Sequence, residues 1–153
     1  MSILINTISL VAAFCAMEIV AWASHKYIMH GFGWEIHKDH HVPHDGMFQR
    51  NDLFFLLFAI PAFLAVFYGA SNGLTWLTSL GFGISAYGFC YFLVHDVFIH
   101  QRFPWFKRTD NAYFRAIRKA HKIHHKSQYK EDGECFGMLF VPFKYFREAR
   151  QVN

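Results

Sequence analysis

Histidine is the residue type whose spacing in this chain points to chemistry. Ten of the 11 histidines fall into two similar half-sites, each an H-x4-H pair followed by an H-x-x-H-H triplet. Neutral imidazoles bind iron, zinc, copper and nickel, and ten of them are more than one ion needs. The repeat therefore predicts a site for two metal ions. The predicted ligands are His25, His30, His37, His40, His41, His95, His100, His121, His124 and His125.

A helical wheel gives each motif an expected role. At about 100° per residue, His37, His40 and His41 share one face of a helix and should form a fork toward a common centre. The paired residues His25 and His30 would stand about 140° apart on a helix, so we expect them to reach two different ions. The second half-site has the same spacings, and the same roles are expected there.

Four further polar residues are candidates for outer contacts to the imidazoles. Asp39 and Asp96 adjoin predicted ligands and could orient imidazole N–H groups, although simple surface solvation is the alternative. His44 is outside the repeat, so we expect it to be no ligand but at most a supporting residue. Glu18 is in an apolar segment, where it serves either as an outer carboxylate or in an interhelical hydrogen bond.

The elements that position these histidines are predicted to be membrane helices. The chain of 153 residues is 54% hydrophobic and contains 19 Phe, which is high for a soluble fold of this size. Three segments, 3–23, 53–70 and 74–94, approach the roughly 20 residues that a spanning helix needs. We therefore expect an all-α integral membrane bundle in one domain. Phe136–Phe146 is interrupted by Pro142, which favours an interfacial position and leaves a fourth span open.

The basic residues predict the orientation of this bundle. All 15 Lys and Arg lie within 26–50 or 102–150, and basic loops are retained on the cytoplasmic side. We expect regions 25–50 and 95–130 to form a cytoplasmic histidine-rich cap, in the bacterial inner membrane. A cleaved signal peptide is disfavoured because no positive region precedes the first apolar segment. The net charge of +4 comes with no nucleic-acid motif, so anionic lipid head groups or an acidic protein are the expected partners of the basic face.

The order of the four histidine motifs resembles the membrane fatty-acid hydroxylase and sterol desaturase superfamily. Flanking words are similar to its β-carotene 3-hydroxylases over roughly residues 20–145: HKDHHVP at 37–43, Asn51-Asp52-Leu53, FLVHDVFIHQRFP at 92–104 and AHKIHH at 120–125. The resemblance implies a non-haem di-iron monooxygenase that uses O2 to hydroxylate β-ionone rings at C3. β-Carotene would become β-cryptoxanthin and then zeaxanthin. The resemblance also implies two Fe ions, which zinc can replace in a purified sample, and a ferredoxin-type electron donor.

Other functions remain open at this point. A hydroxylase or desaturase of the same superfamily could act on a fatty acid or sterol instead. A metal transporter would need polar groups spaced across the bilayer, whereas only Glu18 lies deep in an apolar segment. A membrane protein that binds metal or pigment without catalysis is the third alternative. No G-x-G-x-x-G fingerprint occurs, so electrons for a hydroxylase must come from another protein.

Overall fold

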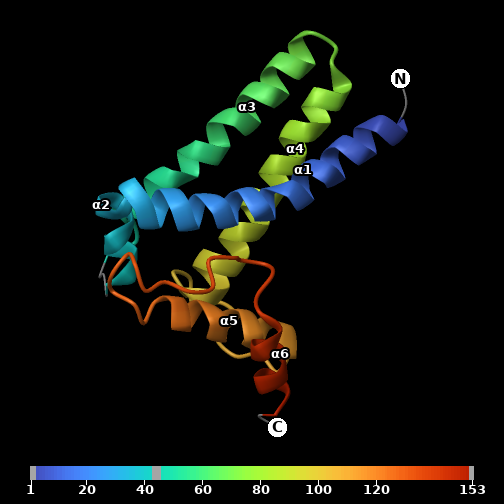
Figure 1. Cartoon of the computed structure of the whole chain (residues 1–153). Helices are drawn as coiled ribbons and strands as arrows, with labels where there is room; N and C mark the ends of the chain where they lie inside the picture. The colour runs from blue at the N-terminus through green and yellow to red at the C-terminus, as the bar shows by residue number, and fades with distance from the viewer. Residues whose placement is uncertain (1–2, 43–45, 152–153) are drawn as a thin grey trace. The chain divides into compact units, whose positions relative to one another are not determined.

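The computed structural model describes residues 3–42 and 46–151, so the prediction for His44 lies outside the described residues. Every regular element in these two ranges is helical, which confirms the all-α prediction (Figure 1). The α-helices are α1 (Ile3–Ala23), α2 (Trp34–His37), α3 (Phe55–Ser71), α4 (Thr75–Phe92), α5 (Ala112–His124) and α6 (Phe143–Arg150). Two π-helices (Ser24–Phe32 and Leu93–Ile99) and two 3-10 helices (Lys38–His41 and Arg50–Phe54) complete the set.

Three helical stretches are long and apolar enough to cross a membrane, which confirms the predicted number. They are Ile3–Phe32, Arg50–Ser71 and Thr75–Ile99. The segment considered for a fourth span is not one helix, because the residues before Pro142 are irregular and α6 begins only at Phe143. Among the described residues, no further helix reaches membrane length.

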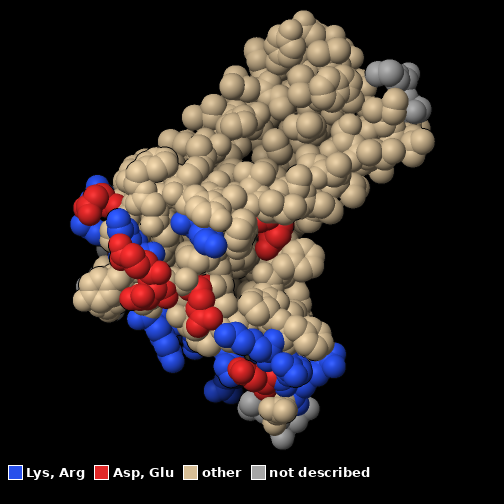
Figure 2. All heavy atoms as spheres, in the orientation of Figure 1, with Lys and Arg blue, Asp and Glu red and all other residues tan. Residues whose placement is uncertain are grey.

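The chain divides into two compact units. The apolar unit comprises residues 1–20 and 52–90, and the histidine unit comprises 21–51 and 91–153. All 15 Lys and Arg belong to the histidine unit, and the blue side chains visible in Figure 2 are therefore its residues. The confinement of the positive charge to the histidine unit follows directly from the sequence.

Close helix contacts hold the apolar unit together. Helices α3 and α4 form an antiparallel hairpin (Figure 1). A Cβ atom on Gly81 would approach the Ala62 carbonyl of α3 to 2.8 Å, and one on Gly83 would clash with the Leu10 carbonyl of α1. Glycine at these two positions lets the neighbouring backbones approach α4 closely, which is how membrane helices gain packing contacts.

Glu18 makes a contact between two helices of the apolar unit. Its carboxylate accepts a hydrogen bond from the Tyr87 hydroxyl at 2.7 Å, and both side chains are buried. The Tyr87 ring packs edge-to-face on Phe14, with centroids 5.7 Å apart. Of the two interpretations offered for Glu18, the interhelical hydrogen bond is therefore confirmed.

Helix α5 leads into the second histidine triplet and is fixed by a cap at its start and by packing along its apolar face. Asn111 caps its start, because the side-chain oxygen accepts from the backbone N–H of Tyr113 at 2.9 Å. Small residues of α5, Ala116 and Ala120, pack against Tyr145 of α6. The apolar stripe of α5 is thereby buried, and its histidines lie at the C-terminal end.

Candidate metal centre

The two H-x4-H pairs lie in or at the end of π-helices. A π-helix joins residues five apart by its i→i+5 hydrogen bonds, and the His100 N–H donates to the His95 carbonyl at 2.9 Å. His25 and His30 lie in the π-helix Ser24–Phe32 and have ring centroids 5.3 Å apart. Each pair therefore serves one centre. The expectation that the two histidines of a pair reach two different ions is wrong, because a helical wheel at about 100° per residue assumes α-helical geometry.

The triplets behave in the opposite way. Helix α2 ends at His37, and the chain tightens into a 3-10 helix over Lys38–His41. As a result His37 and His41 group with one pair, and His40 groups with the other. The expectation of a fork toward one common centre is therefore wrong for the first triplet, and the second triplet is divided in the same manner between His124 and His121.

All ten predicted ligands come together in two clusters of imidazoles. In each group that could hold a metal ion, one nitrogen per ring lies within 4.8 Å of all the others. The Nε2 atom of His125 lies 2.9 Å from that of His121, which adds His125 to the second group. The first cluster is His25, His30, His37, His41 and His124; the second cluster is His40, His95, His100, His121 and His125.

Hydrogen bonds fix the tautomer of every imidazole in the first cluster. Each Nδ1 lies 2.6 to 3.2 Å from an oxygen, to which it donates. A neutral imidazole carries one N–H, so each Nε2 is left with a lone pair. The acceptors are the carbonyls of Phe136, Lys130, Ser127 and Glu134, for His25, His30, His41 and His124 respectively, and Asn51 Oδ1 for His37.

The lone pairs of the first cluster converge with no proton between them. The Nε2 atom of His37 lies 3.2 Å from that of His25 and 3.1 Å from that of His41. Burial lowers the pKa of His37 to about 2 and that of His41 to about 4, so these rings are neutral at pH 7. Facing lone pairs repel unless a cation lies among them.

The spacing of these nitrogens also fits a metal ion. Imidazole bonds of about 2.1 Å place neighbouring nitrogens about 3.0 Å apart around an octahedral ion. Six neighbouring Nε2–Nε2 pairs within the two clusters are 2.9 to 3.3 Å apart. The donor set and its geometry therefore suit one divalent ion in each cluster.

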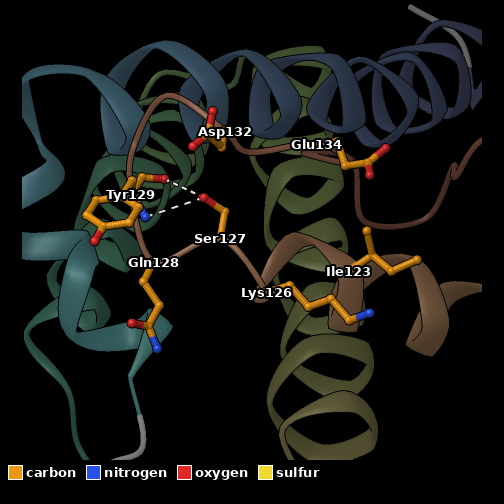
Figure 3. Close-up of a pocket in the computed structure, with 7 residues that line it drawn as sticks. All are labelled: Ile123, Lys126, Ser127, Gln128, Tyr129, Asp132 and Glu134. Carbon is orange, nitrogen blue, oxygen red and sulfur yellow. Dashed lines mark hydrogen bonds between the residues drawn. The ribbon is translucent and has the colours of Figure 1, made fainter.

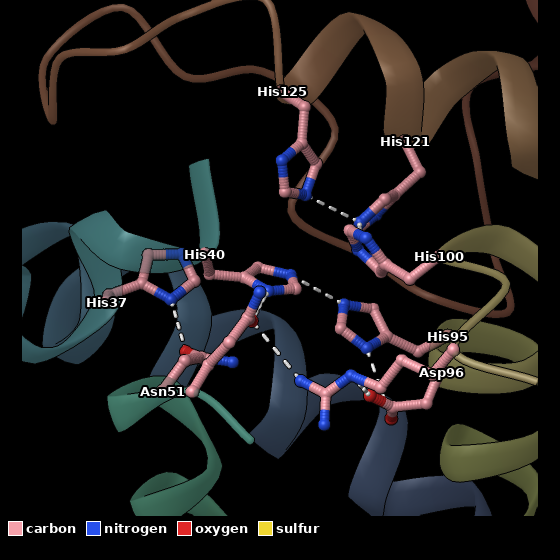
Figure 4. A network of polar contacts seen from close by, with 10 residues as sticks. His37, His40, Asn51, His95, Asp96, His100, His121 and His125 are labelled. Atoms are coloured by element: carbon pink, nitrogen blue, oxygen red, sulfur yellow. Dashed lines mark hydrogen bonds and ion pairs between the residues drawn. The ribbon is translucent and has the colours of Figure 1, made fainter. Parts of the chain in front are cut away.

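Two rings of the second cluster are supported by side chains. His40 Nδ1 lies 2.8 Å from Gln49 Oε1, and His95 Nδ1 lies 3.3 Å from Asp96 Oδ2. The Nε2 atoms of His40 and His95 then face each other at 3.0 Å, as Figure 4 shows. Both rings keep the same tautomer as in the first cluster, because a carboxylate or amide oxygen accepts their Nδ1–H.

The second cluster also borders open space. A hollow of about 780 Å³ is lined by four rings of this cluster, by His41 of the first cluster and by neighbouring residues such as Gln49 and Arg102; the four rings are His40, His100, His121 and His125. His100 and His125 are half-buried, whereas all five rings of the first cluster are buried. The His41 and His125 rings stack with centroids 4.6 Å apart, so the clusters adjoin. Small molecules can thus approach this centre from the side of the second cluster.

The loop that follows α5 supports the first cluster from outside. The carbonyls of Ser127, Lys130 and Glu134 accept from its histidines, while side chains of the same loop line a separate hollow of about 460 Å³ (Figure 3). The Ser127 hydroxyl donates to the Tyr129 carbonyl at 2.9 Å and tightens the turn. None of the histidines in residues 3–42 and 46–151 lines this second hollow, so we assign the loop a supporting role.

Comparison with known proteins gives the centre its context. The model of the family described as "Fatty acid hydroxylase" matches residues 10–146. The chain belongs to the fatty acid hydroxylase family. It is 39% identical to the "Beta-carotene hydroxylase" of Pantoea ananas, over 90% of this chain and 78% of that protein. Identity to the protein of the same name from Pseudescherichia vulneris is 38%, with the same coverage.

Plant relatives are longer than this hydroxylase. The "Beta-carotene 3-hydroxylase, chloroplastic" of Gentiana lutea is 34% identical over 86% of this chain, which spans 42% of the plant protein. No solved structure matches the chain. The resemblance in the histidine motifs is therefore supported by similarity over most of the sequence.

Outer contacts of the hydroxylase match the sequence predictions only in part. Asp96 contacts His95 as predicted. Asp39 supports an imidazole only indirectly, through Asn51. Its carboxylate accepts a hydrogen bond from the backbone N–H of Asn51 at 3.3 Å, and the side-chain oxygen of Asn51 accepts from His37. Glu18 belongs to the apolar unit and bonds Tyr87 instead.

Sequence reasoning missed three kinds of support for the clusters. Asn51 was noted only as part of the family-like segment Asn51-Asp52-Leu53, and Gln49 was not considered. The four supporting carbonyls, at Ser127, Lys130, Glu134 and Phe136, carry no sequence signal because every residue has a carbonyl. A polar amide close to a histidine motif was the one available clue, and it applied to Gln49 and Asn51.

Proposed function

We propose that this hydroxylase inserts one oxygen atom of O2 into the C3–H bond of a β-ionone ring. β-Carotene is converted to β-cryptoxanthin and then to zeaxanthin. Each step consumes one O2, two electrons and two protons, and forms one C–OH group and one water. The observation that carries the proposal is the pair of adjoining clusters of neutral, desolvated imidazoles in a chain 39% identical to a protein named beta-carotene hydroxylase.

The ten histidines are the proposed ligands of two iron ions, one in each cluster. When bound, such an iron pair supplies redox activation of O2. Zinc accepts the same imidazole donors, so a purified sample can contain it in place of iron. The nitrogen spacing and the Nδ1 hydrogen bonds support this assignment.

Residues of this chain keep the imidazole rings neutral and direct their Nε2 atoms toward the centre of each cluster. The Nδ1–H groups donate outward, which presents Nε2 lone pairs inward. Burial holds the pKa of His121 well below its usual value and lowers that of His100 to about 2, so protons do not compete for these nitrogens near pH 7. The substrate and O2 approach through the hollow beside His100 and His125.

Electrons come from a separate ferredoxin-type donor in this proposal. The chain has no dinucleotide fingerprint, and its 15 Lys and Arg, all in the histidine unit, provide a basic surface suited to an acidic protein. The same basic residues favour a cytoplasmic histidine unit, and the bacterial relatives favour the bacterial inner membrane as the location.

Product analysis tests the proposed function. Membranes containing the iron-loaded protein are incubated with β-carotene, a reduced ferredoxin and isotopically labelled O2, and we expect C3-hydroxylated product that carries the label. His37→Ala is the control that should give no product. A second candidate substrate follows from the family description, which is fatty acid hydroxylase. Hydroxylated fatty acid or sterol without hydroxylated carotenoid would reject carotenoid in favour of that lipid.

A further inference from the structure

Two imidazoles of the second cluster are held by side chains that share a common partner. Gln49 accepts from His40, and Asp96 accepts from His95. Arg102 contacts both acceptors. Its Nη2 donates to Gln49 Oε1 at 3.2 Å, and its Nε lies 3.0 Å from Asp96 Oδ1.

Arg102 is placed firmly enough to hold both partners. Its side chain is 16% exposed, and that of Asp96 is 15% exposed. Its backbone N–H also donates to the Asp96 carbonyl at 2.9 Å, just beyond the π-helix. A guanidinium is planar with donors in fixed directions, so it can bond two acceptors at a set angle.

The bond to Arg102 also decides which atom of Gln49 faces His40. A guanidinium only donates, so the amide atom that it contacts must be the oxygen. Because this oxygen acts as an acceptor, the Nδ1 atom of His40 must carry the proton that it donates to Gln49. The Nε2 atom of His40 therefore keeps its lone pair, which is directed at His95.

We propose that Arg102 is a positioning residue that, through Gln49 and Asp96, aims the imidazoles of His40 and His95 at the metal position of the second cluster. This inference rests on the proposed function only in that the clusters bind metal. Arg102 would thereby govern the metal affinity of one cluster and leave the other unchanged. The first cluster has its own support, which runs from Asp39 through Asn51 to His37.

Zinc competition on the full-length protein tests this inference without reference to turnover. The zinc-loaded chain in detergent is titrated with a chelator of known affinity, and the two ions are counted with a metal-sensitive dye. Arg102→Gln should bind one ion as tightly as the unaltered protein and the other about 10- to 100-fold more weakly. Arg102→Lys keeps the positive charge but lacks the planar guanidinium that bonds two acceptors at once, so we expect a smaller loss of metal affinity than in Arg102→Gln. Arg108→Gln removes the same charge from an exposed position and should change neither affinity.

A second pair of variants identifies which ion is weakened. Asn51→Leu removes the acceptor of His37 and should weaken the ion of the first cluster. Combined with Arg102→Gln, it should leave no tightly bound ion. Gln49→Leu removes one of the two contacts of Arg102 and carries the test if Arg102→Gln fails to fold.

The outcomes separate the inference from the proposed function. Two unchanged affinities in Arg102→Gln, or an equal loss at both ions, would overturn the positioning role. One tight ion remaining in the double variant would overturn it too. If the unaltered protein binds two ions but forms no hydroxylated carotenoid, the proposed substrate is wrong while the positioning role stands.

Discussion

The first and second clusters hold equal numbers of imidazoles but are built differently. Four of the five acceptors around the first cluster are backbone carbonyls at Ser127–Phe136, and all five of its rings are buried. Around the second cluster, His40 and His95 donate to side chains bonded to Arg102, and four of its five rings line a hollow that only His41 of the first cluster also reaches. The first cluster is the more enclosed of the two, and its rings donate directly to neutral carbonyl and amide oxygens. The other is open and supported by charge.

This difference shows that equal spacing does not give equal environments. Both half-sites contain the same H-x4-H pair and H-x-x-H-H triplet, yet each cluster takes rings from both. A metal bound to buried rings with fixed tautomers exchanges slowly, whereas one beside a hollow can meet O2 and substrate. We therefore expect the first cluster to retain its ion more firmly and the second to face the substrate.

Loss of one ligand from each cluster should have the largest effect. His124→Ala alters the first cluster, and His100→Ala alters the second. Both should lower hydroxylation more than about 100-fold, because loss of an outer contact alone costs about 10- to 100-fold. Metal analysis should find one ion fewer in each variant, with the remaining ion in the other cluster.

A histidine outside the repeat provides the matched control for these variants. His44→Ala should keep both ions and full turnover, because His44 has no counterpart in the second half-site. If His100→Ala and His124→Ala each lost both ions, the two clusters would be a single cooperative site and the comparison would fail.

Lowering the pH should weaken metal binding in both clusters, and the second cluster should release its ion before the first. Burial lowers the pKa of His37 to about 2 and that of His124 to about 3, against about 6.5 in an unfolded chain. Between pH 6.5 and these values the unfolded chain binds more protons than the folded one, so the free energy of unfolding falls as pH falls. Each unit of pKa difference contributes about 1.4 kcal/mol.

Melting temperature against pH measures this effect in the metal-free protein. We expect a constant melting temperature above pH 7 and a steady fall below pH 6.5. In the metal-loaded protein, a dye that binds released metal should report two phases, the first from the cluster beside the hollow. His100→Ala should lack the fast phase. A single phase in the unaltered protein would contradict the distinction between enclosed and open clusters.

The histidines that cluster and the helices of membrane length could be predicted from the sequence because their signals are local. Imidazole spacing and apolar length are visible in the residues themselves, and the N-cap Asn111 precedes a basic amphipathic stretch. The assignment of rings to clusters could not be predicted. It depends on π-helical turns at Ser24–Phe32 and Leu93–Ile99, which a helical wheel at 100° per residue does not represent.

The outer contacts were predictable only where they involve distinctive side chains. Asp96 stands beside His95 and could be proposed from sequence, whereas Arg102 reaches His40 only through Gln49, which is 53 residues away in the chain. Carbonyl acceptors have no residue preference. Tertiary structure therefore decides how each cluster is supported.

The smallest effect on either cluster should come from a packing change in the apolar unit. Gly83→Ala places a methyl group against the Leu10 backbone and should destabilise the protein by about 1–3 kcal/mol. Gly88→Ala is the matched control, because nothing lies within 4 Å of the added Cβ, and better helix propensity should stabilise by up to about 1 kcal/mol. Thermal unfolding in detergent measures both changes. Because Gly83 lies outside the histidine unit, metal content per folded molecule should stay at two ions in both variants. Loss of one ion in Gly83→Ala alone would mean that packing in the apolar unit helps to hold one of the clusters.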